Sequence, residues 1–190
     1  KIAPFAVNQI IHASNDRLDH DMDLCVTHKV SIIITSLSAP TDYTAPVHAY
    51  GGLVFHDVTN IRHARKALDA GVDGLILVCA GAGGHAGTMN PFALVSEVRQ
   101  FFDGPIALSG AITSGRHLAA ARAMGADLGY AGTRFIASTE ANADLAYKQM
   151  ILESSASDIV YSPLFTGVHG NYLAKSITAA GLDPQNLPTA

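Results

Sequence analysis

The chain has 190 residues, of which 48% are hydrophobic and 15% charged, and its formal net charge is −4 at pH 7. This balance is typical of a globular protein with a large buried fraction and excludes general disorder. An acidic chain without clustered Lys and Arg gives no electrostatic case for nucleic acid or an anionic membrane, so a small molecule is the expected partner.

Six short apolar runs predict β-strands. They are hydrophobic almost throughout, as expected of parallel strands that are covered on both faces. In chain order they occupy residues 5–10, 31–36, 53–56, 74–78, 105–109 and 128–132.

Helical patterns with capping residues lie between these strands. Asn60, Asn90 and Ser114 are the expected N-caps of helices that reach residues 70, 102 and 124. Thr139 is the expected N-cap of a helix that reaches residue 152. An extended run over residues 158–165, a turn over residues 167–172 and a short helix follow. The strand spacing of very roughly 20 to 30 residues persists without a linker, which indicates βα units in one domain.

Two architectures repeat βα units in this way, the open doubly wound sheet and the closed (β/α)8 TIM barrel. A dinucleotide-binding sheet has its glycine-rich turn after the first strand, whereas here such turns follow the last three, at residues 81–87, 109–112 and 132–134. TIM barrels often bind phosphate after strands seven and eight. We therefore expect an α/β fold of the TIM-barrel type, of which this chain covers about six of the eight βα units.

The strand count carries an expectation about the rest of the barrel. Two βα units, on the order of 50 to 80 residues, are expected to precede residue 1. Within the chain, we expect residues 1–157 to form the cofactor-binding barrel portion. Residues 158–190 are expected to begin a lid or a C-terminal extension.

The cysteines and the hydropathy pattern bear on cellular location. Cys25 and Cys79 have no second thiol at metal or redox spacing, and we expect both to be reduced and buried. No apolar run reaches the roughly 18 residues of a membrane span, and no signal-peptide pattern opens the chain. A cytoplasmic location is therefore expected.

The turns after the last two strands are candidates for phosphate binding. Ser109, Gly110 and Ala111 lie just before a helix start, and Gly132 and Thr133 follow the next strand. Backbone N–H groups and hydroxyls in such turns suit a phosphate dianion. Each turn alone is also what any tight βα connection requires, but their occurrence on consecutive strands favours phosphate.

The loop after the fourth strand carries one histidine among glycines. Gly83 and Gly84 precede His85, and Gly87 follows it closely, so that a flat ligand can approach the backbone. His85 is the group in this loop that can transfer a proton near neutral pH, and we expect it to be catalytic; a locally bonded loop histidine is the alternative. The histidines form no metal-binding motif, so no metal site is expected.

Four further polar residues stand where they could reach the same ligand. His56 and Asp57 lie at the end of the third strand, either lining the pocket or forming a structural pair. Asn8 is expected to hydrogen-bond a heterocycle or, alternatively, neighbouring backbone. His169 is expected to contact the substrate if its loop folds over the barrel.

Four segments together resemble the nitronate monooxygenase family, formerly called 2-nitropropane dioxygenases. They are P-F-A-V-N at residues 4–8, A-G-G-H-A-G at 82–87, S-G-A-I-T-S-G-R at 109–116 and G-T-R-F at 132–135. The resemblance runs over essentially the whole chain and implies a TIM barrel that binds FMN. It implies that the phosphate lies on Ser109, Gly110, Ala111, Gly132 and Thr133, with Asn8 near the flavin ring and Gly84 also in contact with the cofactor.

The resemblance also implies an activity. It is the oxidation of alkyl nitronates or nitroalkanes by O2 to a carbonyl compound and nitrite, with His85 as general base. The partners would be the small-molecule substrate and O2, and a homodimer is left open. Three positions depart from the family pattern: Asp57 stands where many relatives have lysine, Ala111 replaces a glycine, and Val78 replaces an acidic residue of some relatives.

Two other functions remain open. Related flavin-dependent enoyl reductases and quinone reductases share parts of the four segments, so NAD(P)H could reduce the flavin and a quinone or enoyl thioester could accept the electrons. Alternatively, the barrel could bind FMN or another phosphate ligand without turnover. His85 discriminates against the last alternative, because a binding module has no use for a proton acceptor there.

Overall fold

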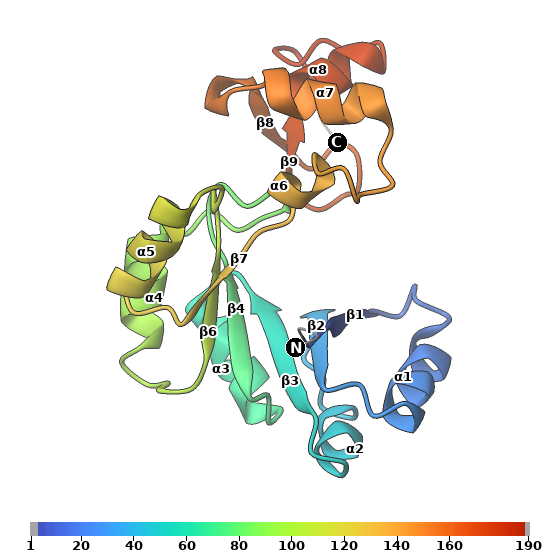
Figure 1. Cartoon of the computed structure of the whole chain (residues 1–190), viewed down its shortest axis with the longest axis vertical. Coiled ribbons are helices and arrows are strands. Elements are labelled where there is room, and N and C mark those ends of the chain that lie inside the picture. Colours follow the sequence, from blue (N-terminus) through green and yellow to red (C-terminus); the bar gives the residue numbers. More distant parts are fainter. Residues whose placement is uncertain (1–3, 189–190) are drawn as a thin grey trace.

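The computed structural model describes residues 4–188, and its centre is a six-stranded parallel sheet (Figure 1). The strands pair in chain order, so that each βα unit packs next to the one before it, as in a TIM barrel. They are β1 (Ala6–Ile11), β2 (Ile32–Leu37), β3 (Leu53–Val58), β4 (Gly74–Val78), β6 (Ile106–Ser109) and β7 (Leu128–Tyr130). All six predicted strands are present, with ends that differ from the predicted ones by at most two residues.

Helices cover the outside of this curved sheet (Figure 1). They are α1 (Leu18–Thr27), α2 (Thr44–His48), α3 (Ile61–Asp69), α4 (Pro91–Val98) and α5 (Gly115–Ala123). Three predicted N-caps are confirmed. The side chains of Asn60, Asn90 and Ser114 accept hydrogen bonds from backbone N–H groups in the first turns of α3, α4 and α5.

The predicted cap of the next long helix is wrong. The long helix α7 (Leu145–Glu153) begins six residues after Thr139, the predicted N-cap. A short helix that was not predicted, α6 (Thr133–Ile136), follows Gly132. The N-cap of α7 is Asp144, whose carboxylate accepts from the N–H of Ala146 at 2.7 Å. The Thr139 hydroxyl donates to Glu140 and is not available to a helix end.

The two faces of the sheet bury different side chains. Residues such as Val54, Val58 and Leu77 point outward and pack with the helices into the main core. Phe55 and Ile76, on the other face, form a small cluster on the inner side of the curve. This alternation follows from the two-residue period of a strand, and it decides which polar residues face the interior of the barrel.

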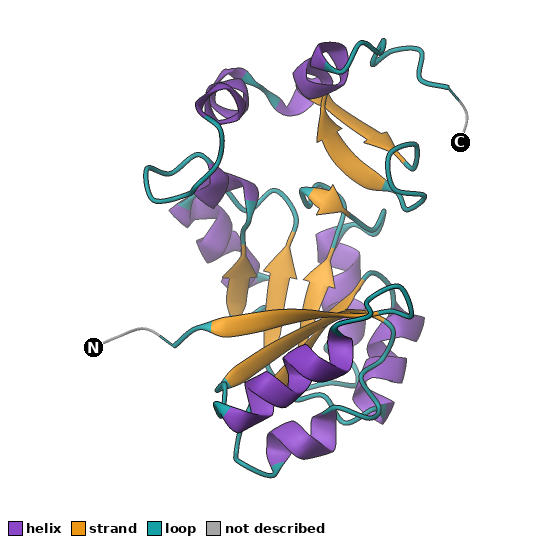
Figure 2. Ribbon diagram, turned by 90° about the vertical axis from the view of Figure 1, so that its right-hand side faces the viewer, coloured by secondary structure: helices purple, strands orange, loops and turns teal. Residues whose placement is uncertain are grey.

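A second, smaller sheet stands beyond the carboxyl ends of the parallel strands (Figure 2). It is antiparallel and has the order β5–β9–β8, with β5 (Gly84–His85), β8 (Ile159–Ser162) and β9 (Gly170–Leu173). The extended run expected over residues 158–165 contains β8, but the turn expected over residues 167–172 is partly wrong, because β9 begins at Gly170. The short helix that follows is α8 (Ala174–Ala179).

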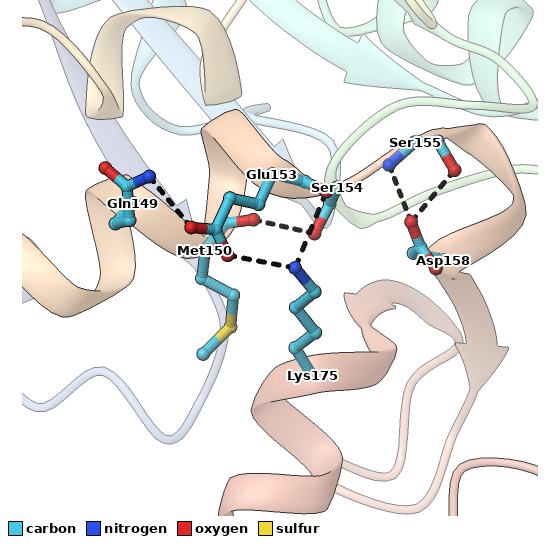
Figure 3. A network of polar contacts seen from close by, with 7 residues as sticks. All are labelled: Gln149, Met150, Glu153, Ser154, Ser155, Asp158 and Lys175. Atoms are coloured by element: carbon cyan, nitrogen blue, oxygen red, sulfur yellow. Dashed lines mark hydrogen bonds and ion pairs between the residues drawn. The ribbon is translucent and has the colours of Figure 1, made fainter.

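Strands β8 and β9 form an antiparallel hairpin, and polar contacts join the helices on either side of it in sequence, α7 and α8 (Figure 3). Glu153, at the end of α7, accepts hydrogen bonds from Gln149 at 2.8 Å and from Lys175 of α8 at 3.1 Å. These two contacts hold the pKa of the Glu153 carboxyl below its usual value. A capping box between Ser155 and Asp158 then forms a short 3-10 turn, Ala156–Asp158, which leads directly into β8.

Two further findings concern the chain as a whole. Within residues 4–188, no helix is long and apolar enough to cross a bilayer. Cys25 and Cys79 are both buried and free, as predicted, and burial raises the pKa of the Cys79 thiol to about 11. Residues 1–3 and 189–190, the outer ends of the two expected segments, lie outside the described residues.

Candidate functional site

Three glycine-rich turns meet at the carboxyl ends of β4, β6 and β7. These strands are neighbours in the sheet, with Val78 opposite Ser109 and Ser109 opposite Tyr130. The backbone of the first turn touches the other two: the N–H of Ala111 donates to Gly81 O at 3.0 Å, and a Cβ at Gly83 would lie 2.4 Å from Thr133 Oγ1. The structure therefore brings the predicted phosphate turns and the histidine loop together.

Backbone conformation at the middle turn is unusual. Gly110 has φ +144°, and a Cβ there would meet the carbonyl oxygen of Ala80 at 2.8 Å. Ala111 has φ +52°, in the left-handed region that favours glycine. Ala111, which replaces a glycine of the pattern described above, thus has a backbone conformation that favours glycine. Because the Ala111 N–H is already bonded to Gly81, Ala111 shapes the turn and does not offer this group to a ligand.

The remaining groups of the two turns suit an anionic ligand. Ser109 ends β6 with its hydroxyl on the inner face, alongside Ala107 and away from the helices. Gly132 has nothing within 4 Å of the position its Cβ would take, so the space beside its backbone is open. Thr133 adds a hydroxyl next to Gly83. Small residues, hydroxyls and open backbone at strand ends are the features that a phosphate group requires.

His85 does not lie in a free loop. It occupies β5, where Gly84 and His85 pair with Asn171 and Gly170 of β9 (Figure 2). Its side chain is exposed, and Nε2 lies 2.8 Å from Thr166 Oγ1, a residue of the loop that joins β8 to β9. The histidine is therefore held between the glycine turns and the hairpin.

Further hydrogen bonds fasten the histidine loop to the hairpin. Asn171 Nδ2 donates to Ala82 O at 2.7 Å, and the Tyr161 hydroxyl donates to Ala86 O at 3.1 Å. The N–H of Ala86 donates to His169 O at 3.3 Å. Backbone on both sides of His85 is thus fixed by residues about 80 positions further along the chain.

His169 joins the site through its main chain. Its carbonyl supports Ala86, while its ring packs against Tyr161 with ring centroids 5.0 Å apart. The loop that carries His169 does fold over toward the histidine loop, which is the condition under which a substrate contact is expected.

A chain of polar groups crosses the inner face of the sheet. Asn8 Nδ2 donates to Ser36 Oγ at 3.4 Å, and Ser36 Oγ donates to Asp57 Oδ2 at 2.8 Å. The other oxygen of Asp57 is buried and has no hydrogen-bond partner within the described part of the chain. Burial raises the pKa of the Asp57 carboxyl, and the Ser36 hydrogen bond opposes this in part. Burial raises the pKa of the Tyr130 hydroxyl of β7, and the charge of Asp57 adds to this effect.

His56 and Asp57 belong to opposite faces. His56 is buried on the helix side with its Nδ1 2.8 Å from Thr35 Oγ1, so it does not line the inner face. Burial lowers its pKa to about 4. The structure therefore separates this pair, because successive strand residues point to opposite sides.

The sequence prediction missed three residues that the structure adds to the site. Ser36 ends a predicted strand, but only the pairing of β2 with β3 places it against Asp57. Thr166 and Asn171 reach the histidine loop only because the β8–β9 hairpin folds next to it. A seryl or threonyl hydroxyl has no local sequence signal for such long-range contacts. In residues 4–188, no group of three or more His, Cys, Asp or Glu side chains is arranged to hold a metal ion.

Comparisons with known proteins agree with this geometry. The family model described as nitronate monooxygenase matches residues 3–183. A nitronate monooxygenase of Paraburkholderia phytofirmans is 30% identical over 168 residues, which cover 83% of this chain and 46% of that protein. A dehydrogenase of an octahydroindene carboxyl-CoA from Rhodococcus jostii is also 30% identical and covers 87% of this chain. The chain thus spans about half the length of the curated relatives that it matches.

A solved structure shows the same fold. FabK from Thermotoga maritima is 31% identical and superposes with a TM-score of 0.82 over 94% of this chain and 58% of its own. The expected TIM-barrel type, with six βα units present in this chain, is confirmed.

Proposed function

The chain belongs to the nitronate monooxygenase family, and on that premise we propose that it is an FMN-dependent oxidoreductase that oxidises alkyl nitronates or nitroalkanes with O2 to a carbonyl compound and nitrite. The observation that carries the proposal is the position of His85. It is fixed on β5, two residues after Gly83, which lies against Thr133 in the turn that follows the last parallel strand. The turns at residues 109–111 and 132–133 form the candidate phosphate cup. A proton acceptor close to this cup is the arrangement that this reaction needs.

The cofactor contacts follow from the turns. Ser109, Gly110, Gly132 and Thr133 would bind the phosphate, and Ala111 would hold the turn in shape through its bond to Gly81. Gly84 would let the flavin approach the backbone, since a Cβ at this position would have no neighbour within 4 Å. Asn8, on the inner face, would lie near the ring. When bound, FMN supplies the electron acceptor for the substrate and the electron donor for O2.

His85 acts on the proton of the substrate. A neutral nitroalkane has an acidic hydrogen on the carbon that bears the nitro group, and His85 would take this proton while the C–H electron pair moves into the nitro group. The product of that step is the nitronate. An added nitronate has already lost this proton, so it needs no base.

This role predicts a selective defect in His85→Asn. The variant keeps the absorbance of bound flavin but loses turnover of nitroethane by about 10²- to 10⁴-fold, because general base catalysis contributes that much. Turnover of ethylnitronate falls far less. Steady-state O2 consumption with each substrate measures the difference, and His28→Asn, at an exposed position on the helix side, is the control. Equal losses on both substrates would remove the general-base role.

The electron donor is tested by anaerobic stopped-flow reduction of the flavin-loaded protein. We expect propyl-2-nitronate to bleach the flavin absorbance and NADH to leave it unchanged. Bleaching by NADH alone would overturn the proposal in favour of a reductase. A protein that binds no flavin would contradict both functions.

A second candidate substrate class is favoured by one relative. The Rhodococcus protein is a dehydrogenase of a carboxyl-CoA, at the same 30% identity as the nitronate monooxygenase. An acyl-CoA thioester is therefore the alternative electron donor. The same stopped-flow experiment with an acyl-CoA tests it, and His85 would again face the substrate proton.

A further inference from the structure

The partner of His85 is a hydroxyl that lies 81 positions further along the chain. Thr166 Oγ1 is 2.8 Å from His85 Nε2, within hydrogen-bond distance. Either atom of such a pair can be the donor, and the choice decides which ring nitrogen of a neutral histidine holds the proton. The surroundings of Thr166 decide between the two cases.

The Thr166 hydroxyl has one proton and two lone pairs. A backbone carbonyl only accepts hydrogen bonds, so the 3.1 Å contact with Val168 O uses the proton of Thr166. The Tyr172 hydroxyl, 3.4 Å away, has a proton of its own to donate. Thr166 is then left with a lone pair toward His85, and the hydrogen bond between them needs a proton on Nε2.

We propose that Thr166 is a positioning residue that holds neutral His85 as the Nε2–H tautomer, so that Nδ1 carries the lone pair that accepts the substrate proton. The inference rests on the proposed function for the role of His85 as base. It does not rest on the identity of the substrate or of the cofactor.

The hairpin makes this hydrogen bond a fixed feature. Thr166 lies in the loop between β8 and β9, and β9 is itself paired with β5 at His85. Asn171 and Tyr161 add side-chain bonds to the backbone on both sides of the histidine. The small sheet therefore holds the backbone at His85 and at both ends of the Thr166 loop, and it keeps these two exposed side chains within hydrogen-bond distance.

The tautomer is tested directly by long-range ¹H–¹⁵N NMR of ¹⁵N-histidine-labelled protein at a pH above the titration range of histidine. The His85 signals are identified by their loss in His85→Asn. In the unaltered protein we expect protonated Nε2 and unprotonated Nδ1. Thr166→Val, which keeps the shape and removes the hydroxyl, should give averaged signals from both tautomers, and Thr166→Ser should restore the original pattern.

Kinetics provide the second readout. Thr166→Val should lower kcat/KM for neutral nitroethane by about tenfold, roughly the effect of one lost hydrogen bond, and leave ethylnitronate turnover nearly unchanged. Thr166→Ser should stay within about twofold of the original enzyme. Thr178→Val, in α8, removes a hydroxyl that donates to Ala174 O and should change neither readout.

The outcomes separate this inference from the proposed function. A proton on Nδ1 in the unaltered protein would overturn the inference, and this measurement needs no variant of Thr166 to fold. Wild-type spectra and kinetics in Thr166→Val would overturn it as well. An Nε2–H signal in a protein that no nitronate reduces would contradict the proposed function and leave the tautomer assignment standing.

Discussion

Ala111 has a side chain although its backbone adopts the left-handed conformation that favours glycine. Its φ of +52° costs a non-glycine residue about 1–2 kcal/mol, and glycine would regain most of this at the expense of about 0.4–1 kcal/mol from a more flexible unfolded chain. Ala111→Gly should therefore raise the free energy of unfolding by about 0.5–1 kcal/mol, measured by urea denaturation. Ala120→Gly, on the exposed side of α5, should lower it by about 0.5–1 kcal/mol. A loss of stability in both variants would show that Ala111 is not strained.

His56 couples stability to pH. Its pKa is about 4 in the folded protein and about 6.5 in an unfolded chain, so the unfolded state binds the extra proton between these values. The stabilisation from neutral His56 is complete above pH 6.5 and is lost as the pH falls through 4. The shift corresponds to about 3 kcal/mol.

The measurement is the free energy of unfolding between pH 7 and pH 4.5. His56→Gln should flatten most of its slope, although His63, whose pKa burial also lowers, keeps a smaller part. His28→Gln, at an exposed position, should retain the original slope. A slope in His56→Gln equal to that of the original protein would contradict the assignment.

Among the elements, the two-residue strand β5 depends most on its neighbours. It has two residues to pair with β9, and the Asn171 side chain adds a bond to Ala82. Asn171→Ala should cost about 1 kcal/mol locally, since one hydrogen bond of a part-buried amide is lost. The expected result is faster hydrogen exchange at the Ala86 N–H, measured by NMR or mass spectrometry, with unchanged exchange in the parallel strands.

Asn186→Ala, in an exposed part of the C-terminal segment, is the matched control and should leave Ala86 protected. If Asn171→Ala slows or does not affect exchange at Ala86, the side chain does not fasten the histidine loop. Uniformly faster exchange would instead indicate a loss of global stability.

At the scale of the whole molecule, the sequence was sufficient for the barrel and insufficient for the small sheet. β4 is a continuous apolar run and β3 opens with one, and Asn60, Asn90 and Ser114 cap through atoms within three residues of themselves. Both signals are local. Thr139 was a plausible cap by type, but Asp144 lies closer to the helix start and has the stronger acceptor.

The histidine site shows the same limit. His85, its glycines and the turns at Ser109 and Gly132 could be placed at one rim from strand order alone. The pairing of β5 with β9 could not, because a two-residue strand has no periodicity and its partner is more than 80 residues away. The faces of His56 and Asp57 required the register of β3, which a one-residue shift would invert.

The 81-residue separation between His85 and Thr166 also sets an order of events during protein synthesis. At about 5–20 residues per second, Thr166 is made roughly 4 to 16 s after His85, and after Ser109, Gly110, Gly132 and Thr133. A nascent chain thus contains every residue of the candidate phosphate cup before it contains Thr166, the hydrogen-bond partner of His85. Translation therefore completes the hydrogen bond that orients His85 later than it completes the turns that are the candidate phosphate site.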